Sequence, residues 1–286
     1  EDISLQLIET YLGDILRETG RLVFAGGGAL NVKLNQKILA LPHVKELFVQ
    51  PAASDSGTAV GAASFASWKR GVTPAKMEHV YLGPAYSTDE CVDACEAHPE
   101  HPVYEKLSNI VGRAAELLNE GNPVAWCQGR MEFGPRALGG RSILGSPSYL
   151  GIANKINEQI KFRERWRPFC PSVLDTVAKE MIQTDHPAPY MTITFEVSEE
   201  WKSRIPEVVH EDGTSRVQIV DESTNPKYHA LLKEMERLNG NGAVLNTSMN
   251  RRGEPMVCSP TDALNMFYGS DLEYLVLEDL LVTKRK

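Results

Sequence analysis

Along residues 1–70 the hydrophobic positions follow helical and extended spacings in turn. Across residues 2–19 apolar side chains recur three and four positions apart, which is the spacing of one face of an α-helix. Residues 21–25 form a short apolar run that predicts a buried strand, and three consecutive glycines then predict a tight turn. The same signals predict a helix, a strand and a further helix at 30–41, 46–50 and 58–69. Strand, turn and helix repeated in this order are typical of an α/β fold.

The pattern loosens between residues 71 and 104, where prolines interrupt it and only one short helix, around Cys91, is expected. Regular spacing then resumes. It predicts helices at 105–119, 152–160, 226–238 and 260–268, and strands at 123–127, 190–197, 216–220, 243–245 and 272–282. The chain is therefore expected to contain a partial α/β lobe at 1–74, a linker at 75–104 and a mixed α/β domain at 105–286.

Composition changes this picture little. Apolar residues make up 42% and charged residues 24% of the chain, as in ordinary globular proteins, and the longest apolar runs are too short to span a membrane. Five scattered cysteines form no disulfide framework, so reduced thiols and a cytoplasmic location are expected. The chain opens on a glutamate, without a secretory signal or an initiator methionine, and we expect it to be cut from a longer protein.

The distribution of charge is more informative. The chain carries a formal net charge of -8, yet residues 130–167 hold eight basic residues against three acidic ones. Such a cationic segment predicts a concave site for a small, highly charged anion, because a nucleic-acid-binding surface would normally make the whole domain basic. A solvated basic face with surface ion pairs is the alternative. The candidate phosphate ligands are Arg136, Arg141, Lys161, Arg163 and Arg167.

Two motifs in the first lobe are candidates for ligand binding. AGGGALN, at 25–31, leads from a strand end into a helix, where glycines allow a phosphate to approach backbone amides. The geometry of a tight turn would also explain these glycines. QPAASDSGTAVGAA, at 50–63, places Asp55 on a loop after a strand. For Asp55 a metal ligand and an N-cap of the following helix are both open, and this motif alone favours the cap.

Two motifs in the second domain lie beside predicted strands. In HEDGTSRVQ, at 210–218, we expect His210, Thr214 and Arg216 to face one pocket, although a lone histidine is more often structural than catalytic. In NTSMN, at 246–250, short polar side chains at a strand end offer donors and acceptors to a ligand. Turn formation alone is the alternative explanation for the NTSMN residues.

Taken in order, these strings resemble the NodU/CmcH/TobZ O-carbamoyltransferases. The resemblance rests on AGGGALN, QPAASDSGTAVGAA, GRMEFGPRALGGRSILGSP, KFRERWRPFCPSV, HEDGTSRVQ and NTSMNRRGEPMVCSPTDAL, and it covers nearly the whole chain. Members of that family are longer, and they pair an actin/hexokinase-type (ASKHA) domain with a C-terminal YrdC-like domain. The resemblance therefore implies part of the second actin-like lobe at 1–74. It also implies a YrdC-like domain with a twisted, partly open sheet at 105–286.

The resemblance implies a two-step reaction. Carbamoyl phosphate yields carbamate, which ATP converts to carbamoyl adenylate with release of pyrophosphate. A hydroxyl of a sugar or natural-product acceptor then attacks the carbamoyl carbon. The implied cofactors are ATP and a divalent metal ion, either iron or magnesium. Carbamoyl phosphate and the acceptor are the implied partners, and neither nucleic acid nor a membrane is expected.

Motifs of the family carry over to numbered residues of this chain. The Lys-x-Arg and Ser-x-Asn signatures match Lys161, Arg163, Ser248 and Asn250, which are expected to hold the carbamoyl and phosphate groups of the adenylate. Asp55 matches the metal-binding aspartate of the actin-like domain, which shifts its interpretation toward function. The implied catalytic residues are Lys161, Arg163, His210 and Arg216, and the implied ligand-binding residues are Gly27, Gly28, Asn31, Arg136, Arg141, Arg167, Thr247, Ser248 and Asn250.

The chain departs from the family's pattern at two places. The paired-histidine metal motif of the first lobe is absent, since no histidine precedes His43, so we expect activation of the carbamoyl group without transfer to an acceptor. Gly140 also stands where an asparagine is usual. The rival interpretations are a threonylcarbamoyl-adenylate-type enzyme of tRNA modification and a non-catalytic nucleotide- or RNA-binding module. The long EFGPRALGGRS and HEDGTSRVQ strings argue against the first rival, and the scarcity of aromatic residues argues against the second.

Overall fold

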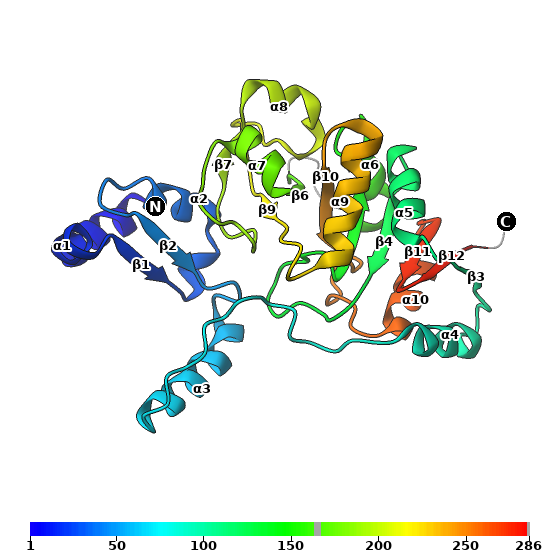
Figure 1. Ribbon diagram of the computed structural model, residues 1–286, viewed down its shortest axis with the longest axis horizontal. Helices are drawn as coiled ribbons and strands as arrows, with labels where there is room; N and C mark the ends of the chain where they lie inside the picture. The colour runs from blue at the N-terminus through cyan, green and yellow to red at the C-terminus, as the bar shows by residue number, and fades with distance from the viewer. Residues whose placement is uncertain (163–166, 285–286) are drawn as a thin grey trace.

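A computed structural model describes residues 1–162 and 167–284, and its N-terminal unit is built around a two-stranded parallel sheet (Figure 1). Val23 of β1 lies opposite Phe48 of β2, and α2 connects the two strands. The elements of this unit are α1 (Asp2–Thr19), β1 (Arg21–Phe24), the 3-10 turn η1 (Gly27–Leu30), α2 (Val32–Leu39), β2 (Glu46–Val49), the 3-10 turn η2 (Asp55–Gly57) and α3 (Thr58–Lys69).

The second domain is organised around an eight-stranded mixed sheet of order β3-β12-β11-β4-β5-β10-β6-β9. Neighbouring strands are antiparallel, except for the parallel pairs β11–β4 and β6–β9. A separate antiparallel pair is formed by β7 and β8. The strands of this domain are β3 (Val103–Lys106), β4 (Val124–Cys127), β5 (Arg141–Gly145), β6 (Cys170–Val173), β7 (Phe195–Glu196), β8 (Thr214–Ser215), β9 (Gln218–Ile219), β10 (Ala243–Ser248), β11 (Tyr274–Leu277) and β12 (Leu280–Thr283).

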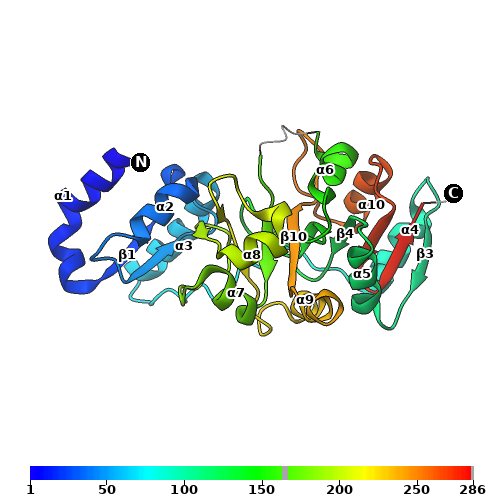
Figure 2. The ribbon, with the colours of Figure 1, turned by 90° about the horizontal axis from the view of Figure 1, so that it is seen from above.

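Helices lie on both faces of this large sheet. α5 and α9 pack against each other on one face, and α6 lies on the opposite side of β10 (Figure 2). α10 packs against α4, and each of these two helices begins with a serine that forms a capping box with the acidic residue three positions later. The helices are α4 (Thr88–Ala97), α5 (Ile110–Asn119), α6 (Ile152–Ile156), the π-helical turn η3 (Asn157–Lys161), α7 (Asp175–Ile182), α8 (Glu199–Arg204), the 3-10 turn η4 (Pro206–Val208), α9 (Pro226–Asn239) and α10 (Pro260–Tyr268).

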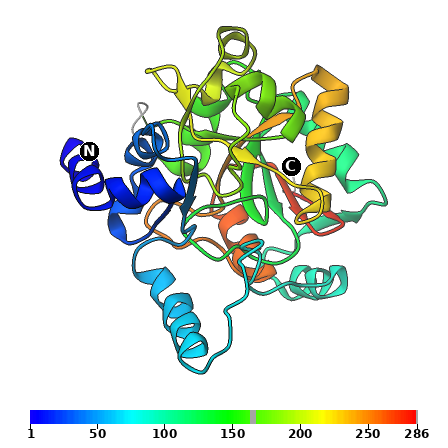
Figure 3. The same cartoon turned by 60° about the vertical axis from the view of Figure 1, so that its left-hand side comes forward.

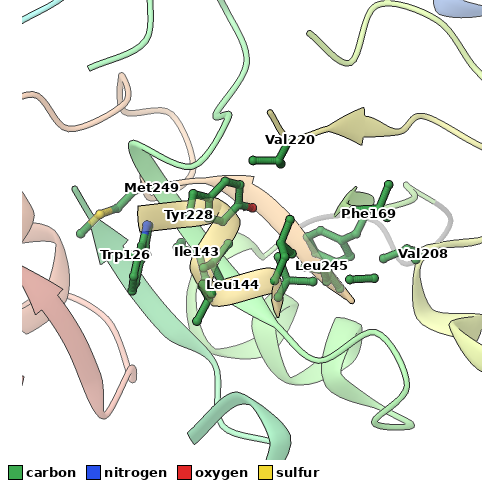
Figure 4. Packing of buried hydrophobic residues seen from close by; sticks show 14 of the residues in the cluster. Trp126, Ile143, Leu144, Phe169, Val208, Val220, Tyr228, Leu245 and Met249 are labelled. Carbon is green, nitrogen blue, oxygen red and sulfur yellow. The ribbon is translucent and has the colours of Figure 1, made fainter. Parts of the chain in front are cut away.

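The core of the second domain lies between the sheet and these helices. Trp126 and Tyr228 are fully buried there beside Ile143 and Leu144 (Figure 4). The indole Nε1 of Trp126 donates a hydrogen bond to the carbonyl oxygen of Gly139 at 3.0 Å. Gly139 has a φ of +100°, and a Cβ atom there would lie 2.2 Å from the Tyr228 ring, so only glycine fits this approach. The core therefore holds the loop that precedes β5 in one position.

The N-terminal unit buries its apolar side chains less completely. Ile3, Leu7, Tyr11 and Ile15 recur four positions apart along α1, and all four are exposed. α3 has no buried residue and projects away from both sheets (Figures 1 and 3). Parallel sheets normally have both faces covered, and exposed apolar surface of this extent is typical of protein–protein contacts. No described helix is long and apolar enough to cross a membrane.

The N-terminal unit contacts the second domain mainly through α2. Asn35 is fully buried, and its Nδ2 donates to the carbonyl oxygen of Thr192 at 2.8 Å. The hydroxyl of Thr194 donates to Oε1 of Gln36 at 2.8 Å. These hydrogen bonds hold α2 against the segment that leads into β7.

The structure confirms the mixed α/β fold predicted from the sequence, and several element boundaries differ from the prediction. The helix predicted at 105–119 is wrong over its first residues, because Val103–Lys106 pairs with β12 and the helix begins only at Ile110. The single strand predicted at 272–282 is a hairpin that turns at Glu278, which has a φ of 48°. β5 begins at Arg141, directly after the loop that contains the glycines at 134, 139 and 140, and pairs with β4 and β10.

Candidate functional site

A polar hollow opens near the end of β10 and the start of β6. Arg136 enters it from the loop before β5, and Arg216 enters it from the segment between β8 and β9. Asn246, Thr247 and Ser248 line it from the last residues of β10. Residues far apart in the sequence therefore gather two guanidinium groups and several short polar side chains around one space.

The two arginines of this hollow carry charge without an acidic partner. Among the residues that the structure describes, neither Arg136 nor Arg216 forms an ion pair with a carboxylate, and Nε of Arg216 instead donates to Sγ of Cys170 at 3.1 Å. Burial, and secondarily the charge of Arg216, lowers the pKa of Arg136 to about 10. A bound anion would relieve this repulsion, and guanidinium groups bind phosphate oxygens in pairs. The hollow is therefore suited to a small phosphate-bearing ligand.

Two further hollows continue the first one and share residues with it. One contains Arg167 and His210 together with Arg136 and Arg216. The other contains Lys161 and Asn250 together with Arg167 and Ser248. We call the three hollows together the cationic cleft, defined by Arg136, Lys161, Arg167, His210, Arg216, Ser248 and Asn250. The cleft brings together these seven residues and Thr247, all of which the sequence singled out.

Lys161 lies buried at one end of the cationic cleft, with 2% of its surface exposed. Its Nζ donates to the carbonyl oxygen of Asn250 at 2.9 Å and to Oδ1 of the same residue at 2.8 Å. It also donates to the carbonyl oxygen of Ser248 at 2.5 Å. The Ser248 hydroxyl in turn donates to Oδ1 of Asn250 at 2.6 Å. The structure thus joins the lysine of the Lys-x-Arg signature to both residues of the Ser-x-Asn signature.

His210 lies on the turn that precedes β8, and its Nδ1 is 3.3 Å from the hydroxyl oxygen of Thr214. Nε2 of His210 is buried and has no hydrogen-bond partner within the described part of the chain. Burial lowers the pKa of His210, so the imidazole is mainly neutral near pH 7. The sequence predicted that His210, Thr214 and Arg216 face one pocket. His210 and Arg216 line the same hollow, whereas Thr214 is buried and does not line it.

Arg141 and Glu132 organise the loop before β5 and lie outside the cationic cleft. Arg141 is 1% exposed, and Glu132 accepts hydrogen bonds at Oε1 from the backbone N–H groups of Leu138, Gly140 and Arg141. The Arg141 guanidinium donates to five backbone carbonyl oxygens, those of Pro84, Gln128, Gly129, Gly140 and Cys258. Because carbonyls surround this guanidinium, the geometry gives Arg141 a structural role and does not bring it to a phosphate.

The candidate residues of the first lobe lie apart from the cleft. Asn31 accepts hydrogen bonds at Oδ1 from the backbone N–H groups of Lys33 and Leu34, so it is the N-cap of α2. Gly27 and Gly28 are exposed in η1. The end of this turn adjoins the cleft, because Ala29 and Leu30 line a small hollow together with Arg136.

Asp55 is exposed at the first residue of η2. Within residues 1–162 and 167–284 no three His, Cys, Asp or Glu side chains gather into a group that could hold a metal ion. One exposed carboxylate does not make a metal centre, because structural and catalytic metals in proteins take at least three ligands from side chains or substrate. The described residues therefore do not fit a metal site by themselves, and no step is assigned to a metal below.

Arg163, which the Lys-x-Arg signature singles out, lies outside the described residues. Arg167 and Thr247 both line the cationic cleft.

Asn246 is the first residue of NTSMN but was not among the predicted ligand-binding residues. Its Nδ2 donates to the carbonyl oxygen of Ala137 at 3.1 Å and its Oδ1 is buried without a partner in the described part of the chain. The signal in the sequence was the NTSMN motif itself, whose short polar side chains were expected to offer donors and acceptors to a ligand.

Comparisons with known proteins agree with this gathering of motifs. A family model described as "Carbamoyltransferase C-terminus" matches residues 115–284, and one described as "Carbamoyltransferase N-terminus" matches residues 2–64. The chain belongs to the carbamoyltransferase family. The first match covers β4 to β12 and therefore the whole cationic cleft as described here, while the second covers the two-stranded sheet of the N-terminal unit.

Similar curated proteins come from bacteria and archaea. An uncharacterised protein of Synechocystis is 38% identical over 99% of this chain and 50% of its own length. The nodulation protein NolNO of Sinorhizobium fredii is 38% identical over 100% of this chain and 44% of its own length. The nodulation protein U of Rhizobium tropici is 37% identical over 81% of this chain and 39% of its own length. This carbamoyltransferase-family chain thus spans about half the length of the curated relatives it matches.

Among solved structures, HypF of T. kodakarensis aligns with 63% of this chain and 22% of its own, at a TM-score of 0.42 and 18% sequence identity. Sua5 of P. abyssi aligns with 56% of this chain and 43% of its own, at a TM-score of 0.37 and 17% identity.

Proposed function

We propose that this chain provides the carbamoyl-activating site of an ATP-dependent O-carbamoyltransferase. The observation that carries the proposal is the pair of guanidinium groups of Arg136 and Arg216, which form no ion pair with a described carboxylate and share one cleft with the buried ammonium of Lys161. Carbamoyl phosphate and ATP are both polyanions, and their reaction concentrates negative charge on transferring groups. Clustered fixed cations stabilise such transition states more than a protein nucleophile does.

The proposed reaction has three steps, of which the first two take place in the cleft. Water cleaves carbamoyl phosphate to carbamate and inorganic phosphate. A carbamate oxygen then attacks the α-phosphorus of ATP, the bond to the β-phosphate oxygen breaks, and pyrophosphate leaves as carbamoyl adenylate forms. In the last step the hydroxyl oxygen of an acceptor attacks the carbamoyl carbon, the hydroxyl proton passes to a base and AMP leaves.

The residues of the cleft divide this work according to their positions. Arg136 and Arg216 bind the phosphate of carbamoyl phosphate, because both line the hollow and no carboxylate of the described residues pairs with them. Lys161 keeps Ser248 and Asn250 in place, so that their short polar side chains contact the carbamoyl and phosphate groups of the adenylate. We further propose a hydroxyl of a sugar or natural product as the acceptor, and transfer to it requires residues beyond those of this cleft.

The test is release of pyrophosphate from ATP, measured with and without carbamoyl phosphate. Release that depends on carbamoyl phosphate, and that falls about 100-fold in Arg216→Met, is expected. The matched control is Arg237→Met, which removes an exposed arginine that pairs with Glu234. Release that requires threonine and bicarbonate in place of carbamoyl phosphate would contradict the proposal. Salt-sensitive binding of oligonucleotides without pyrophosphate release would point instead to a nucleic-acid-binding module.

A further inference from the structure

The cationic cleft contains one hydrogen-bond acceptor whose protonation state can be worked out from its neighbours. The hydroxyl of Thr214 donates its single proton to Oδ1 of Asp212, at 2.6 Å. The same oxygen accepts a hydrogen bond from Nζ of Lys33 at 2.7 Å, since an ammonium can only donate. Nδ1 of His210, 3.3 Å away, therefore meets a lone pair and has to carry the proton itself.

A neutral imidazole protonated at Nδ1 has a bare lone pair at Nε2. The backbone of the turn holds the histidine in this position, because the N–H of His210 donates to the carbonyl oxygen of Thr214 at 2.8 Å and the N–H of Gly213 donates to the carbonyl oxygen of His210 at 2.9 Å. Nε2 is shielded from bulk water and has no partner among the described residues. Nε2 is thus an unpaired acceptor on a residue that lines the hollow.

The charges around this acceptor favour the neutral ring. Arg216 and Arg167 face it from the cleft, Lys33 faces it from α2, and Asp212 is the carboxylate on its own turn. Burial alone would raise the pKa of Asp212, but hydrogen bonds from Lys33 and Thr214 outweigh burial and lower it, so this carboxylate stays ionised. Lys33 and Asp212 lie 2.5 Å apart and largely offset each other's charge, so burial and the charge of Arg216 oppose protonation of the imidazole.

We propose that His210, held in this tautomer by Thr214 and Lys33, selects carbamoyl phosphate from other acyl phosphates. An acceptor beside two guanidinium groups matches a ligand with an N–H donor next to a phosphate. Carbamoyl phosphate has such a donor in its –NH₂ group, whereas acetyl phosphate has a methyl group in the same place. A site built to receive an N–H rejects the analogue that lacks it, because a buried polar atom then stays unpaired.

This inference assigns a positioning role to a residue of the N-terminal unit. Lys33 lies on α2, 181 positions before Thr214, and touches the cleft only through this network. The inference rests on the proposed function, since it names the group of carbamoyl phosphate that the same site recognises by a hydrogen bond. The tautomer of His210 in the cleft then depends on the contact between α2 and the turn before β8.

The first arm of the test measures the tautomer without any ligand. Nitrogen-15 NMR of the imidazole rings, with His210→Gln to assign the signals, should show His210 as the Nδ1–H form at pH 7. Lys33→Met and Thr214→Val should shift it toward the Nε2–H form, whereas Thr214→Ser should keep the native spectrum. Lys37→Met is the matched control, because Lys37 is also on α2 but pairs with Glu1. A native ring protonated at Nε2, or one unchanged in Lys33→Met, would overturn the inference.

The second arm measures competition of carbamoyl phosphate and acetyl phosphate for the cleft by calorimetry. The native protein should prefer carbamoyl phosphate roughly 10- to 100-fold, a preference lost in His210→Leu and partly kept in His210→Gln, whose amide oxygen can accept the same hydrogen bond. Equal binding of both compounds by the native protein would overturn the selectivity while leaving the proposed function intact. No binding of carbamoyl phosphate at all would overturn the proposed function, and the selectivity with it.

Discussion

The ammonium nitrogen of Lys161 lies 2.8 Å from the side-chain oxygen of Asn250, a residue 89 positions further along the chain. The contact joins the π-helical turn that follows α6 to the polar loop that follows β10. A buried lysine is costly unless its charge is well hydrogen-bonded, and here backbone and side-chain oxygens of the loop receive it. The Lys161 ammonium thereby holds in place the loop that lines the cleft.

Replacing Lys161 by methionine keeps most of its volume and removes the charge. The carbonyl oxygens of Ser248 and Asn250 then lose a donor, so we expect a loss of about 1–3 kcal/mol in the free energy of unfolding. Urea denaturation of native protein and variant measures this difference. Lys233→Met removes an exposed lysine that pairs with Glu236 and should change stability by less than about 1 kcal/mol. Equal effects of the two substitutions would contradict the structural role of Lys161.

The charge of Arg136 is expected to lower the free energy of unfolding and to favour binding of an anionic ligand. Its charge is partly desolvated and lies near that of Arg216, so Arg136→Met should raise the free energy of unfolding by roughly 1 kcal/mol. Inorganic phosphate should raise the melting temperature of the native protein and have little effect on the variant. Thermal unfolding with increasing phosphate measures both effects. A variant with a lower free energy of unfolding than the native protein would contradict the first expectation. A variant whose melting temperature still rises fully with phosphate would contradict the role of Arg136 in binding.

Gly140 is packed so closely that a side chain at this position should have a measurable cost. A Cβ atom at this position would lie 2.9 Å from both the carbonyl oxygen of Arg130 and Oε2 of Glu132. Gly140→Asn should therefore move the Glu132 carboxylate away from the backbone N–H groups that donate hydrogen bonds to it. The loss of these hydrogen bonds should lower the free energy of unfolding by about 1–3 kcal/mol. Chemical denaturation measures this cost. A neutral result would mean that the loop before β5 can shift without losing these hydrogen bonds.

Two histidines should make the fold sensitive to mild acid. Burial lowers the pKa of both His186 and His210 in the native state below the ordinary value of 6.5. The unfolded chain therefore takes up protons first as the pH falls through about 6.5, and stability decreases on acidification below that point. His186→Asn should reduce this slope, by at most about 1.4 kcal/mol per pH unit. Unfolding free energies at pH 5 to 8 check the prediction, and an unchanged slope would contradict it.

The cysteines should differ sharply in reactivity. Burial raises the pKa of Cys91 and Cys127 to about 12 and that of Cys95 to about 11, so these thiols are poor nucleophiles. Cys258 is partly exposed and should be alkylated first by iodoacetamide at pH 8. Mass spectrometry of the native protein after brief labelling identifies the modified residue. Early modification of Cys91 would show that α4 opens readily, since that thiol is 1% exposed.

Much of the local structure could be predicted from the sequence. The spacing of apolar residues identifies α1 (Asp2–Thr19), α3 (Thr58–Lys69) and α10 (Pro260–Tyr268), because helix periodicity is a property of neighbouring positions. β3 (Val103–Lys106) was missed for the opposite reason. Its extended form depends on a partner strand more than 170 positions later, and no local pattern reports that pairing.

The amino-acid sequence specifies which chemical groups are available to the site: a run of cations among glycines, a histidine turn and a polar Ser-x-Asn loop. The tertiary structure alone decided which of these groups meet. Arg136 and Arg141 are five positions apart in one motif, yet the first opens on the cleft and the second is enclosed by carbonyl oxygens. Lys33 carried no signal in the sequence, and only packing of α2 against the second domain brings it to Thr214. The strength of hydrogen bonds and of Coulomb interactions depends on the distance between two groups in space. The number of residues between the two groups along the chain does not give that distance.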